Sequence, residues 1–207
     1  MNLKQLLEMP QYYHKEMKSD PHDQMTPFFI TDERMEERYT VLAQRDNVVA
    51  VIAKDGGNAM VCVRTTRHDG ESGVMSYGNL IFKANFKIGA AVDSLQLQAQ
   101  KVLQVSVVTV VNDDKFKGLA SFLYSSLVQA GYTVISDTSH FIGGRQLWKK
   151  LARSHLPNEG VYLINNGNAV MDADGKPLEY NGTNVPDADI WSTSTEHEFV
   201  LFVYKLR

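Results

Sequence analysis

The clearest pattern along the chain is a run of β-branched and apolar residues, then a polar loop, then apolar residues at helical spacing. Residues 102–111 predict a buried strand, and residues 112–120 predict a loop that contains one glycine and opens into a helix. The helical pattern ends before Gly131, a residue suited to a helix C-terminus. The expected inner face of this helix comprises Leu119, Phe122, Leu123, Ser126, Leu127 and Ala130.

The pattern after this helix predicts a parallel crossover. Residues 132–136 form a short apolar run close behind the helix, so the simplest arrangement is a right-handed β-α-β unit with two parallel strands. A second helix starts near Gly144, and its expected inner face comprises Leu147, Trp148, Leu151 and Ala152. Two β-rich runs, at 161–164 and 199–204, follow it.

Two helices are expected in the N-terminal part. Residues 3–7 carry leucines at helical spacing until Pro10 ends the helix. Thr31 is followed by two acidic residues, which is typical of a helix start. The inward residues of this second helix are Met35, Tyr39 and Leu42.

A hairpin is expected next, because the period of the pattern changes to two. Strands at 47–53 and 59–66 flank a turn at 55–58. A further strand is expected within 73–82. Residues 92–102 fit either a strand or a short helix, and both interpretations stay open.

Together these elements predict one α/β domain. Residues 1–46 form an N-terminal helical segment of that domain, and residues 47–207 form its core. The stretch at about 165–197 is rich in Asn, Asp, Gly and Thr, with a hairpin at 172–176. That composition predicts an insert that leaves the core.

Composition and charge narrow the function classes. The chain has 207 residues, of which 43% are hydrophobic, so it is long enough to bury a substantial core. Its formal net charge of -3 gives no overall basic field, so a nucleic acid would need a local patch. No apolar run approaches the roughly 18 residues of a membrane span, and the first ten residues lack the apolar stretch of a signal peptide. We therefore expect a cytoplasmic protein without a membrane partner.

Neither the cysteine nor the histidines indicate a catalytic or metal-binding site. Cys62, the single cysteine, lies between two valines in a strand-like run, which favours a small buried hydrophobe over a catalytic thiol. The six histidines are scattered without the spacing of metal ligands. No metal site is therefore expected.

The order of elements resembles the GNAT superfamily of N-acetyltransferases. In that family the loop before the central helix reads Arg or Gln, two residues, Gly, one residue, then Gly or Ala, and this chain has Lys115, Phe116-Lys117, Gly118, Leu119 and Ala120. The resemblance implies a mixed, mostly antiparallel sheet with a central parallel β-α-β crossover, flanked by helices. It also implies acetyl-CoA as cosubstrate, its pyrophosphate held by the loop amides. The implied cofactor-binding residues are Val108, Val110, Lys115, Phe116, Lys117, Gly118, Leu119, Ala120 and Trp148.

The loop also has a physical basis for binding phosphate. Gly118 lets the backbone approach an anion without a Cβ, and the helix N-terminus contributes about half a positive charge. Lys115 and Lys117 add cations, whereas Asp113 and Asp114 place negative charge nearby. The alternative is an ordinary β-α turn.

The resemblance implies direct transfer of the acetyl group to an uncharged amine. The family's frequent acid is a tyrosine of the second helix, but Trp148 stands there and an indole supplies no proton at useful pH. The candidate catalytic residues are Asp137, Ser139 and His140, with Asp137 and His140 as candidate bases because they follow the second parallel strand. Helix capping by Asp137–Ser139 is the alternative.

A basic stripe marks the second helix. Its cations are Arg145, Lys149, Lys150 and Arg153. The stripe is typical of a solvated face, and the functional alternative is a phosphate-bearing acceptor such as tRNA or DNA. A homodimer paired through 199–206 also stays open.

Three functions follow from these patterns. The first is an acetyl-CoA-dependent N-acyltransferase acting on a primary amine of a small molecule or protein. The second is a GNAT-like transferase acting on nucleic acid or aminoacyl-tRNA. The third is a catalytically degenerate GNAT-like domain that binds a partner protein.

Overall fold

A computed structural model describes residues 11–13, 30–66, 75–88, 95, 101–110, 118–137, 139–165, 167–191 and 200–207. The helix expected at 3–7, and residues 115–117 of the expected phosphate loop, lie outside the described residues. The chain forms two compact units. Unit 1 comprises Met1–Met17, Ile88–Val105 and Gly131–Arg207, and unit 2 comprises Lys18–Lys87 and Ser106–Ala130.

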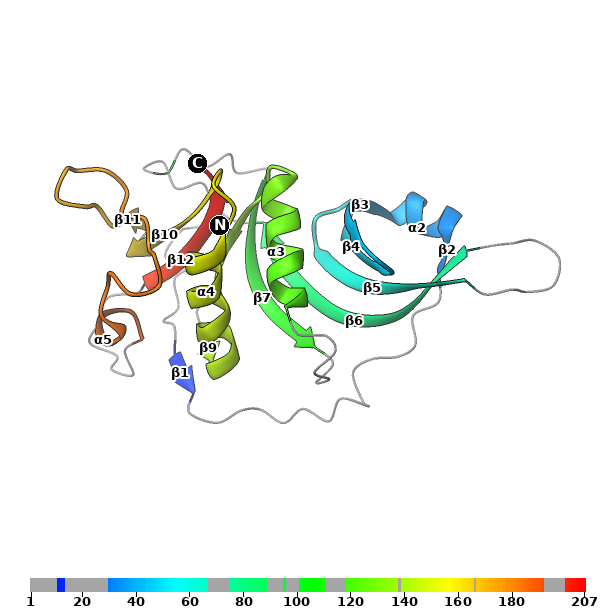
Figure 1. The fold of residues 1–207 in the computed structure, drawn as a ribbon, viewed down its shortest axis with the longest axis horizontal. Helices are drawn as coiled ribbons and strands as arrows, with labels where there is room; N and C mark the ends of the chain where they lie inside the picture. The colour runs from blue at the N-terminus through cyan, green and yellow to red at the C-terminus, as the bar shows by residue number, and fades with distance from the viewer. Residues whose placement is uncertain are drawn as a thin grey trace. The chain divides into compact units, whose positions relative to one another are not determined.

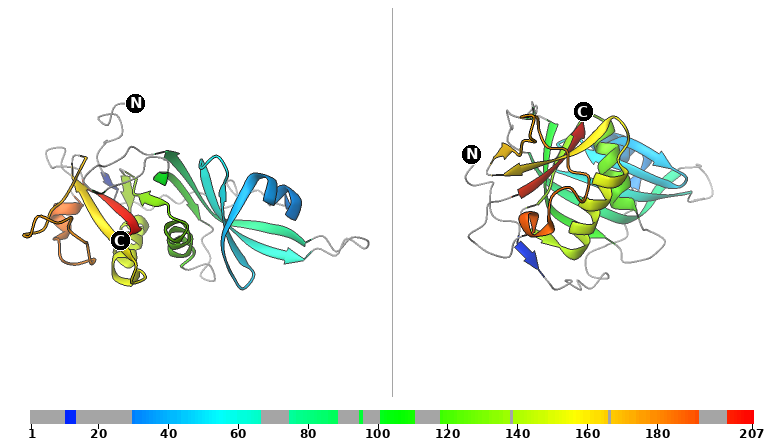
Figure 2. Two further views of the ribbon diagram at one scale, coloured as in Figure 1. Left: turned by 90° about the horizontal axis from the view of Figure 1, so that it is seen from above. Right: turned by 60° about the vertical axis from the view of Figure 1, so that its left-hand side comes forward.

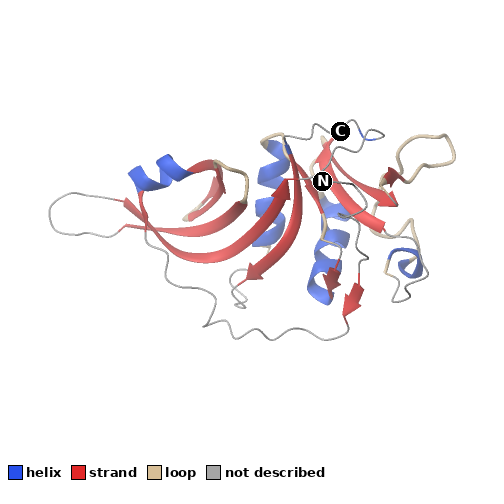
Figure 3. Cartoon of the chain, turned by 180° about the vertical axis from the view of Figure 1, so that it is seen from behind, coloured by secondary structure: helices blue, strands red, loops and turns tan. Residues whose placement is uncertain are grey.

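Figure 1 labels the helices and strands in chain order. The strands are β1 (Gln11–Tyr13), β2 (Ile30–Thr31), β3 (Tyr39–Arg45), β4 (Val48–Ala53), β5 (Asn58–Thr66), β6 (Met75–Ile88), β7 (Val102–Val110), β8 (Thr133–Ile135), β9 (Ser139–Phe141), β10 (Glu159–Asn165), β11 (Asn168–Ala169) and β12 (Val200–Leu206). The helices are α2 (Asp32–Arg38), α3 (Leu119–Gln129), α4 (Ile142–Ser154) and α5 (Asp187–Ile190). Helices lie against strands in each unit (Figure 3), as expected for an α/β fold.

Unit 2 contains an antiparallel meander. Strands β3, β4, β5 and β6 pair in sequence order, and β2 also pairs with β6. The β4–β5 hairpin has the expected position, with Val51 opposite Met60. Its turn is closed by Gly57 N, which donates to Asp55 Oδ1 over 2.8 Å. The expected hairpin is therefore confirmed, and β6 runs further than expected, to Ile88.

The helix expected from Thr31 is shorter than its apolar pattern suggested. Met35 is buried in α2 as expected, but the helix ends at Arg38. Tyr39 instead begins β3 and pairs with Ala53 of β4. The sequence Tyr-Thr-Val favours a strand, and pairing with β4 satisfies its backbone groups. The prediction that Tyr39 and Leu42 are helical was therefore wrong.

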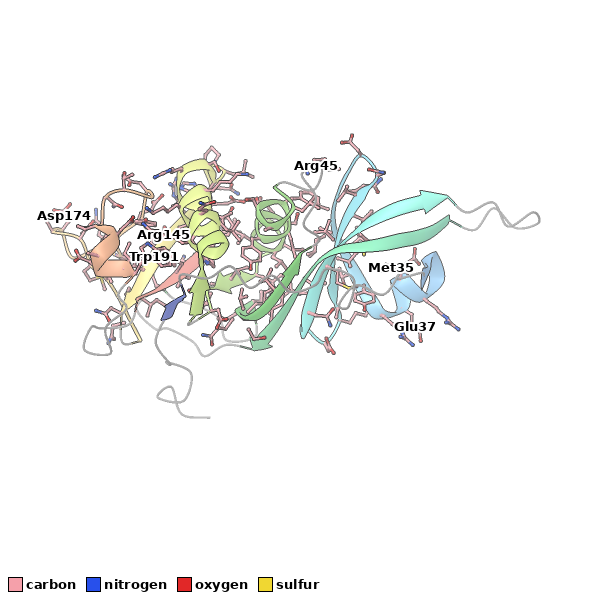
Figure 4. All side chains as sticks on the ribbon, turned by 90° about the horizontal axis from the view of Figure 1, so that it is seen from below. Met35, Glu37, Arg45, Arg145, Asp174 and Trp191 are labelled. Carbon is pink, nitrogen blue, oxygen red and sulfur yellow. The ribbon has the colours of Figure 1, made fainter. Side chains whose placement is uncertain are left out.

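The meander of unit 2 is buried on both faces. On one face Met35 packs with Val49, Val51, Met60 and Cys62 in one cluster, where Figure 4 labels Met35. Helix α3 packs against β3, β4 and β5 and contributes no residue to that cluster, so it covers the opposite face. The buried residues of that opposite face are Ala50, Ile52, Ala59 and Val61.

The inner face of α3 differs from the expected stripe at its edges. Leu119, Leu123 and Leu127 are buried as expected, but Tyr124 and Val128 are also buried. Phe122 is half-buried, with the Arg45 guanidinium carbon 4.9 Å from its ring centroid. Because α3 packs against β3, β4 and β5, its buried face is wider than the stripe expected from the sequence.

The two parallel strands of the crossover pair within unit 1. Its strand order is β11-β10-β12-β8-β7, and β7 is followed in the strand order by β6. Strands β7 and β8 are parallel, with Val102 opposite Thr133 and Gln104 opposite Ile135. The expected parallel return strand is therefore confirmed, within an otherwise antiparallel arrangement of β8, β10, β11 and β12.

Strand β12 lies inside the sheet. It pairs with β10 along one edge and with β8 along the other, antiparallel in both cases. Strand β12 therefore has a partner on each side over these registers, which does not favour pairing of 199–206 with a second copy. The homodimer itself stays a prediction.

The segment expected to be an insert outside the core contributes to the core. Its hairpin is present at the expected place, where Asp172 N donates to Lys176 O over 2.7 Å. Beyond it, Tyr180, Ile190 and Trp191 are no more than 7% exposed. These three residues are part of the core of unit 1, and the polar composition of the segment gave no indication of their burial. Figure 2 shows this segment and α5 in orange beside α4.

Candidate functional site

Helix α3 starts directly after a glycine with a left-handed backbone conformation. Gly118 has φ +88°, in the left-handed region that favours glycine, and Phe122 N donates to Gly118 O over 3.0 Å. Among the described residues no side chain caps this end, and the first turn of α3 has no acidic residue. Backbone N–H groups of the first helical turn have no acceptor within their own helix. This end of α3 can therefore offer N–H groups to an anion.

Strand β7 supplies the other expected cofactor-binding residues. Its parallel register with β8 ends at Gln104, whereas β7 itself continues to Val110. Val108 is 40% exposed on this continuation. Unit 2 thus contains Val108 and Val110 together with the start of α3.

Residues 119 and 120 have different roles in such a site. Leu119 is 3% exposed, so its side chain belongs to the core and only its backbone can face a ligand. Ala120 is half-buried, and its small side chain keeps the first turn slim. Lys115, Phe116 and Lys117 lie outside the described residues.

The candidate acid and base residues belong to unit 1. Asp137 is half-buried directly after β8. Ser139 and His140 lie in β9, where Ser139 is opposite Gln11 and His140 is opposite Tyr12 of β1. Helix α4 begins at Ile142, so Asp137 and Ser139 both precede its cap position. The three candidates are neighbours in the sequence, and none of them stands directly before α4, where a cap residue would lie.

Trp148 is part of the core of unit 1. It is 3% exposed and stacks on Phe202 of β12, with ring centroids 5.4 Å apart and an interplanar angle of 12°. Tyr180 and Trp191 also pack on Phe202, at 5.4 Å and 5.0 Å. An indole buried in such a cluster contributes packing energy.

Comparisons with protein-family models, curated proteins and solved structures found no match for this chain. The resemblance to GNAT acyltransferases therefore depends on the chain's own features. The main ones are the parallel pair β7–β8 and Gly118 at the start of α3.

The basic stripe of α4 contacts the segment that follows β11. Arg145 and Lys149 both bind the carboxylate of Asp187 in α5, and the distance from Lys149 Nζ to Asp187 Oδ1 is 2.6 Å. Arg153 Nη2 donates to Gly182 O over 3.2 Å. The sequence did not identify Asp187 as the partner of the basic stripe. Two signals for such a pairing were present, namely cations four residues apart in the second helix and a later segment rich in Asp.

The burial of Cys62 excludes thiolate chemistry at neutral pH. Its side chain is fully buried, and burial raises the pKa of the thiol to about 12. The prediction that Cys62 is a small buried hydrophobe is therefore confirmed.

Two further searches cover the described part of the chain. Within it, no three His, Cys, Asp or Glu side chains gather as metal ligands do. None of its helices combines the length and the apolar character that crossing a membrane requires.

Proposed function

We propose that this chain is an acetyl-CoA-dependent N-acyltransferase that transfers an acetyl group directly to a primary amine. The observation that carries the proposal is the parallel β7-α3-β8 crossover with Gly118 at positive φ directly before α3. A mixed sheet with a central parallel crossover agrees with the resemblance to the GNAT superfamily. Fold alone does not define an activity, so the local chemistry has to support it.

In this proposal the phosphate end of acetyl-CoA binds at the start of α3. Its uncapped first turn offers N–H groups, and the helix dipole favours negative charge there. Lys115 and Lys117 of the preceding loop would add positive charge. Since Leu119 points into the core, recognition of the phosphates relies on backbone groups, for which Gly118 keeps space.

The pantetheine arm has a place along β7. The strand continues beyond its register with β8, so the backbone from Ser106 to Val110 is a candidate partner for the amides of that arm. Val108 adds an exposed apolar side chain to the same strand. Both halves of the proposed cofactor site therefore belong to unit 2.

The acyl-transfer step needs a neutral amine. Its nitrogen attacks the thioester carbonyl carbon, the C–S bond breaks, and the electron pair leaves with the sulfur. Asp137 and His140 are the candidate bases that take the amine proton. Trp148 is buried and donates no proton to the thiolate, so the thiolate leaves without help from this position.

A binding titration tests the proposal. Acetyl-CoA should raise the melting temperature of the wild-type chain, whereas Gly118→Glu should abolish the shift because it places a carboxylate at the phosphate site. Gly175→Glu is the matched control. Gly175 also has a positive φ, +73°, and a side chain added there would meet no atom within 4 Å, so this variant should keep the wild-type shift.

A turnover assay separates the proposed enzyme from its main alternative. Release of the free thiol from acetyl-CoA in the presence of a panel of primary amines should exceed release without them. The alternative is a GNAT-like domain that binds coenzyme A or a partner protein without catalysis, and the buried Trp148 at the tyrosine position favours it. Binding without amine-dependent release would support that alternative, and no binding at millimolar acetyl-CoA would reject both cofactor-binding proposals.

A transferase acting on nucleic acid or aminoacyl-tRNA is less favoured. Arg145 and Lys149, which would bind such an acceptor, already share the carboxylate of Asp187. A nucleic acid would have to displace this carboxylate.

A further inference from the structure

A tight turn after Tyr180 is held by one asparagine side chain. Asn181 Oδ1 accepts hydrogen bonds from Thr183 N over 2.9 Å, from Thr183 Oγ1 over 3.0 Å and from Asn184 N over 2.9 Å. Asn184 completes the turn, because its Oδ1 accepts a hydrogen bond from Asn181 N over 3.0 Å. Asparagine side chains commonly form turns by bonding to the backbone a few residues on. This turn therefore depends on the side-chain oxygen at position 181.

The residue after this asparagine has to be glycine. Gly182 has φ +88°, in the left-handed region that glycine adopts without strain. A Cβ at this position would lie 2.8 Å from Arg153 Nε and 3.1 Å from Lys149 O, an atom of the α4 backbone. Gly182 O also accepts a hydrogen bond from Arg153 Nη2 over 3.2 Å. Close approach to α4 thus requires glycine directly after Asn181.

An asparagine followed by glycine carries its own nucleophile. The backbone nitrogen of Gly182 can attack the side-chain carbonyl carbon of Asn181, because the new bond closes a five-membered ring within the same chain. Glycine has no side chain to hinder this attack. Among the described residues, neither Gly182 N nor Asn181 Nδ2 donates a hydrogen bond. The hydrogen bonds of the turn therefore hold neither the nucleophile nor the leaving group.

The turn also surrounds the reacting oxygen with donors. Attack on the side-chain carbonyl carbon converts Asn181 Oδ1 into an oxyanion, and two N–H groups and one hydroxyl already donate to this oxygen. Donors fixed in this way stabilise an oxyanion more than they stabilise a neutral amide oxygen. Asn181 is exposed, so water and hydroxide reach it. The folded turn therefore lowers the barrier to the attack.

We propose that Asn181 is a site of spontaneous modification, where the folded turn promotes conversion of the asparagine to isoaspartate and aspartate. Hydroxide takes the proton of Gly182 N–H, the nitrogen bonds to Asn181 Cγ, and the bond from Cγ to the side-chain amide nitrogen breaks. The electron pair of that bond leaves with the amide nitrogen, which takes a proton from water and departs as ammonia. Water then opens the cyclic imide at either of its carbonyl carbons, which gives the two acids. This site is independent of the proposed acyltransferase function.

Isoaspartate changes the path of the backbone at this turn. Its main chain runs through the former side chain and is longer by one methylene group. The set of hydrogen bonds that Thr183 and Asn184 donate to Asn181 Oδ1 depends on the original path and is lost in this form. The modification therefore loosens the turn that lies against Arg153 of α4.

Peptide mapping by mass spectrometry, with fragmentation that distinguishes isoaspartate from aspartate, tests the site. The protein is incubated at mildly alkaline pH, and the converted fraction at position 181 is followed with time. Asn181 should convert faster in the native chain than in the chain unfolded in urea, because only the native turn fixes the three donors.

Two variants of Thr183 separate the effect of the turn from that of the dipeptide. Thr183→Val should slow native conversion about fivefold, because it removes the hydroxyl donor and keeps the N–H donor. Thr183→Ser is the matched control and should keep the wild-type rate, because its hydroxyl remains. In the unfolded chain both variants should convert at the same rate.

Three outcomes would overturn the proposal. The first is slower conversion of Asn181 in the native chain than in the unfolded chain. The second is an equal native rate in Thr183→Val and Thr183→Ser. The third is a difference between these variants that persists in the unfolded chain, because the effect would then not depend on the turn. Faster native conversion, with a difference confined to the native state, would support the proposal.

Discussion

Cys62 shows how burial alone determines the chemistry of a residue. The thiol packs with Val49, Val51 and Met60, and burial raises its pKa to about 12. The folded chain therefore retains a proton that the unfolded chain loses from about pH 9 upward. By linkage, the contribution of this thiol to stability is fully present below that pH and falls as the pH rises toward 12.

Thiol labelling checks the state of Cys62. Because the chain has one cysteine, all labelling reports this residue. At pH 8 the native protein should react with a thiol reagent much more slowly than the protein unfolded in urea. Rapid, stoichiometric labelling of the native protein would contradict the structure.

The sequence predicted individual residues when their role depended on near neighbours. Cys62 between two valines was predicted to be buried, and Gly118 was predicted to lie in the loop directly before a helix. Asp187 could not be predicted in the same way. Its partners Lys149 and Arg145 lie 38 and 42 residues away along the chain, and the fold brings them together.

At the scale of elements, β12 organises the core of unit 1. Phe202 on this strand packs against Trp148 of α4, against Tyr180, and against Trp191. The strand also pairs with β8 and β10. The side chain of Phe202 therefore contributes to the packing of α4, of the sheet and of the segment after β11.

Replacement of Phe202 tests this dependence. Phe202→Leu should lower the free energy of unfolding by about 1–3 kcal/mol, because it removes aromatic contacts and leaves space. It should also change the native fluorescence, since both tryptophans of the chain stack on Phe202. Urea unfolding followed by fluorescence measures both effects.

Phe86→Leu provides the matched control. Phe86 is 7% exposed in unit 2, which contains neither tryptophan. This variant should lose stability with unchanged native fluorescence. Unchanged fluorescence in Phe202→Leu would contradict the aromatic cluster.

Elements with a strong period were predicted well. The β4–β5 hairpin, β7, α3, β8 and α4 all follow apolar patterns that last for most of the element. The end of α2 was not predicted, because Met35 and Tyr39 fit one helical face while pairing with β4 decides the structure of Tyr39. The buried part of 167–191 was missed because three apolar anchors are spread through a polar segment.

At the scale of the whole molecule, the β7-α3-β8 pattern in the sequence was enough to predict an α/β fold with a mixed sheet. A strand, a helix and a strand in close succession permit few arrangements, and the parallel pair β7–β8 is the expected one. The division into two units was less visible in the sequence, since β7 runs through both, with Val105 in unit 1 and Ser106 in unit 2. A continuous β-rich run carries no sign of such a boundary.

The two groups of candidate residues belong to different units. The residues proposed to bind acetyl-CoA belong to unit 2, whereas Asp137, Ser139 and His140 belong to unit 1. The net charge of -3 makes a broad attraction to nucleic acid unfavourable, so any phosphate binding has to come from local groups. The start of α3 is the local group on which the proposed function depends.

Residue-resolved hydrogen exchange with and without acetyl-CoA tests the central claim most directly. The amides of Leu119, Ala120 and Ser121 have no acceptor within α3 and should exchange quickly in the free protein. With saturating acetyl-CoA they should become protected, together with amides of β7 between Ser106 and Val110. Unchanged exchange at both places would contradict the account, and so would protection confined to the α4 face.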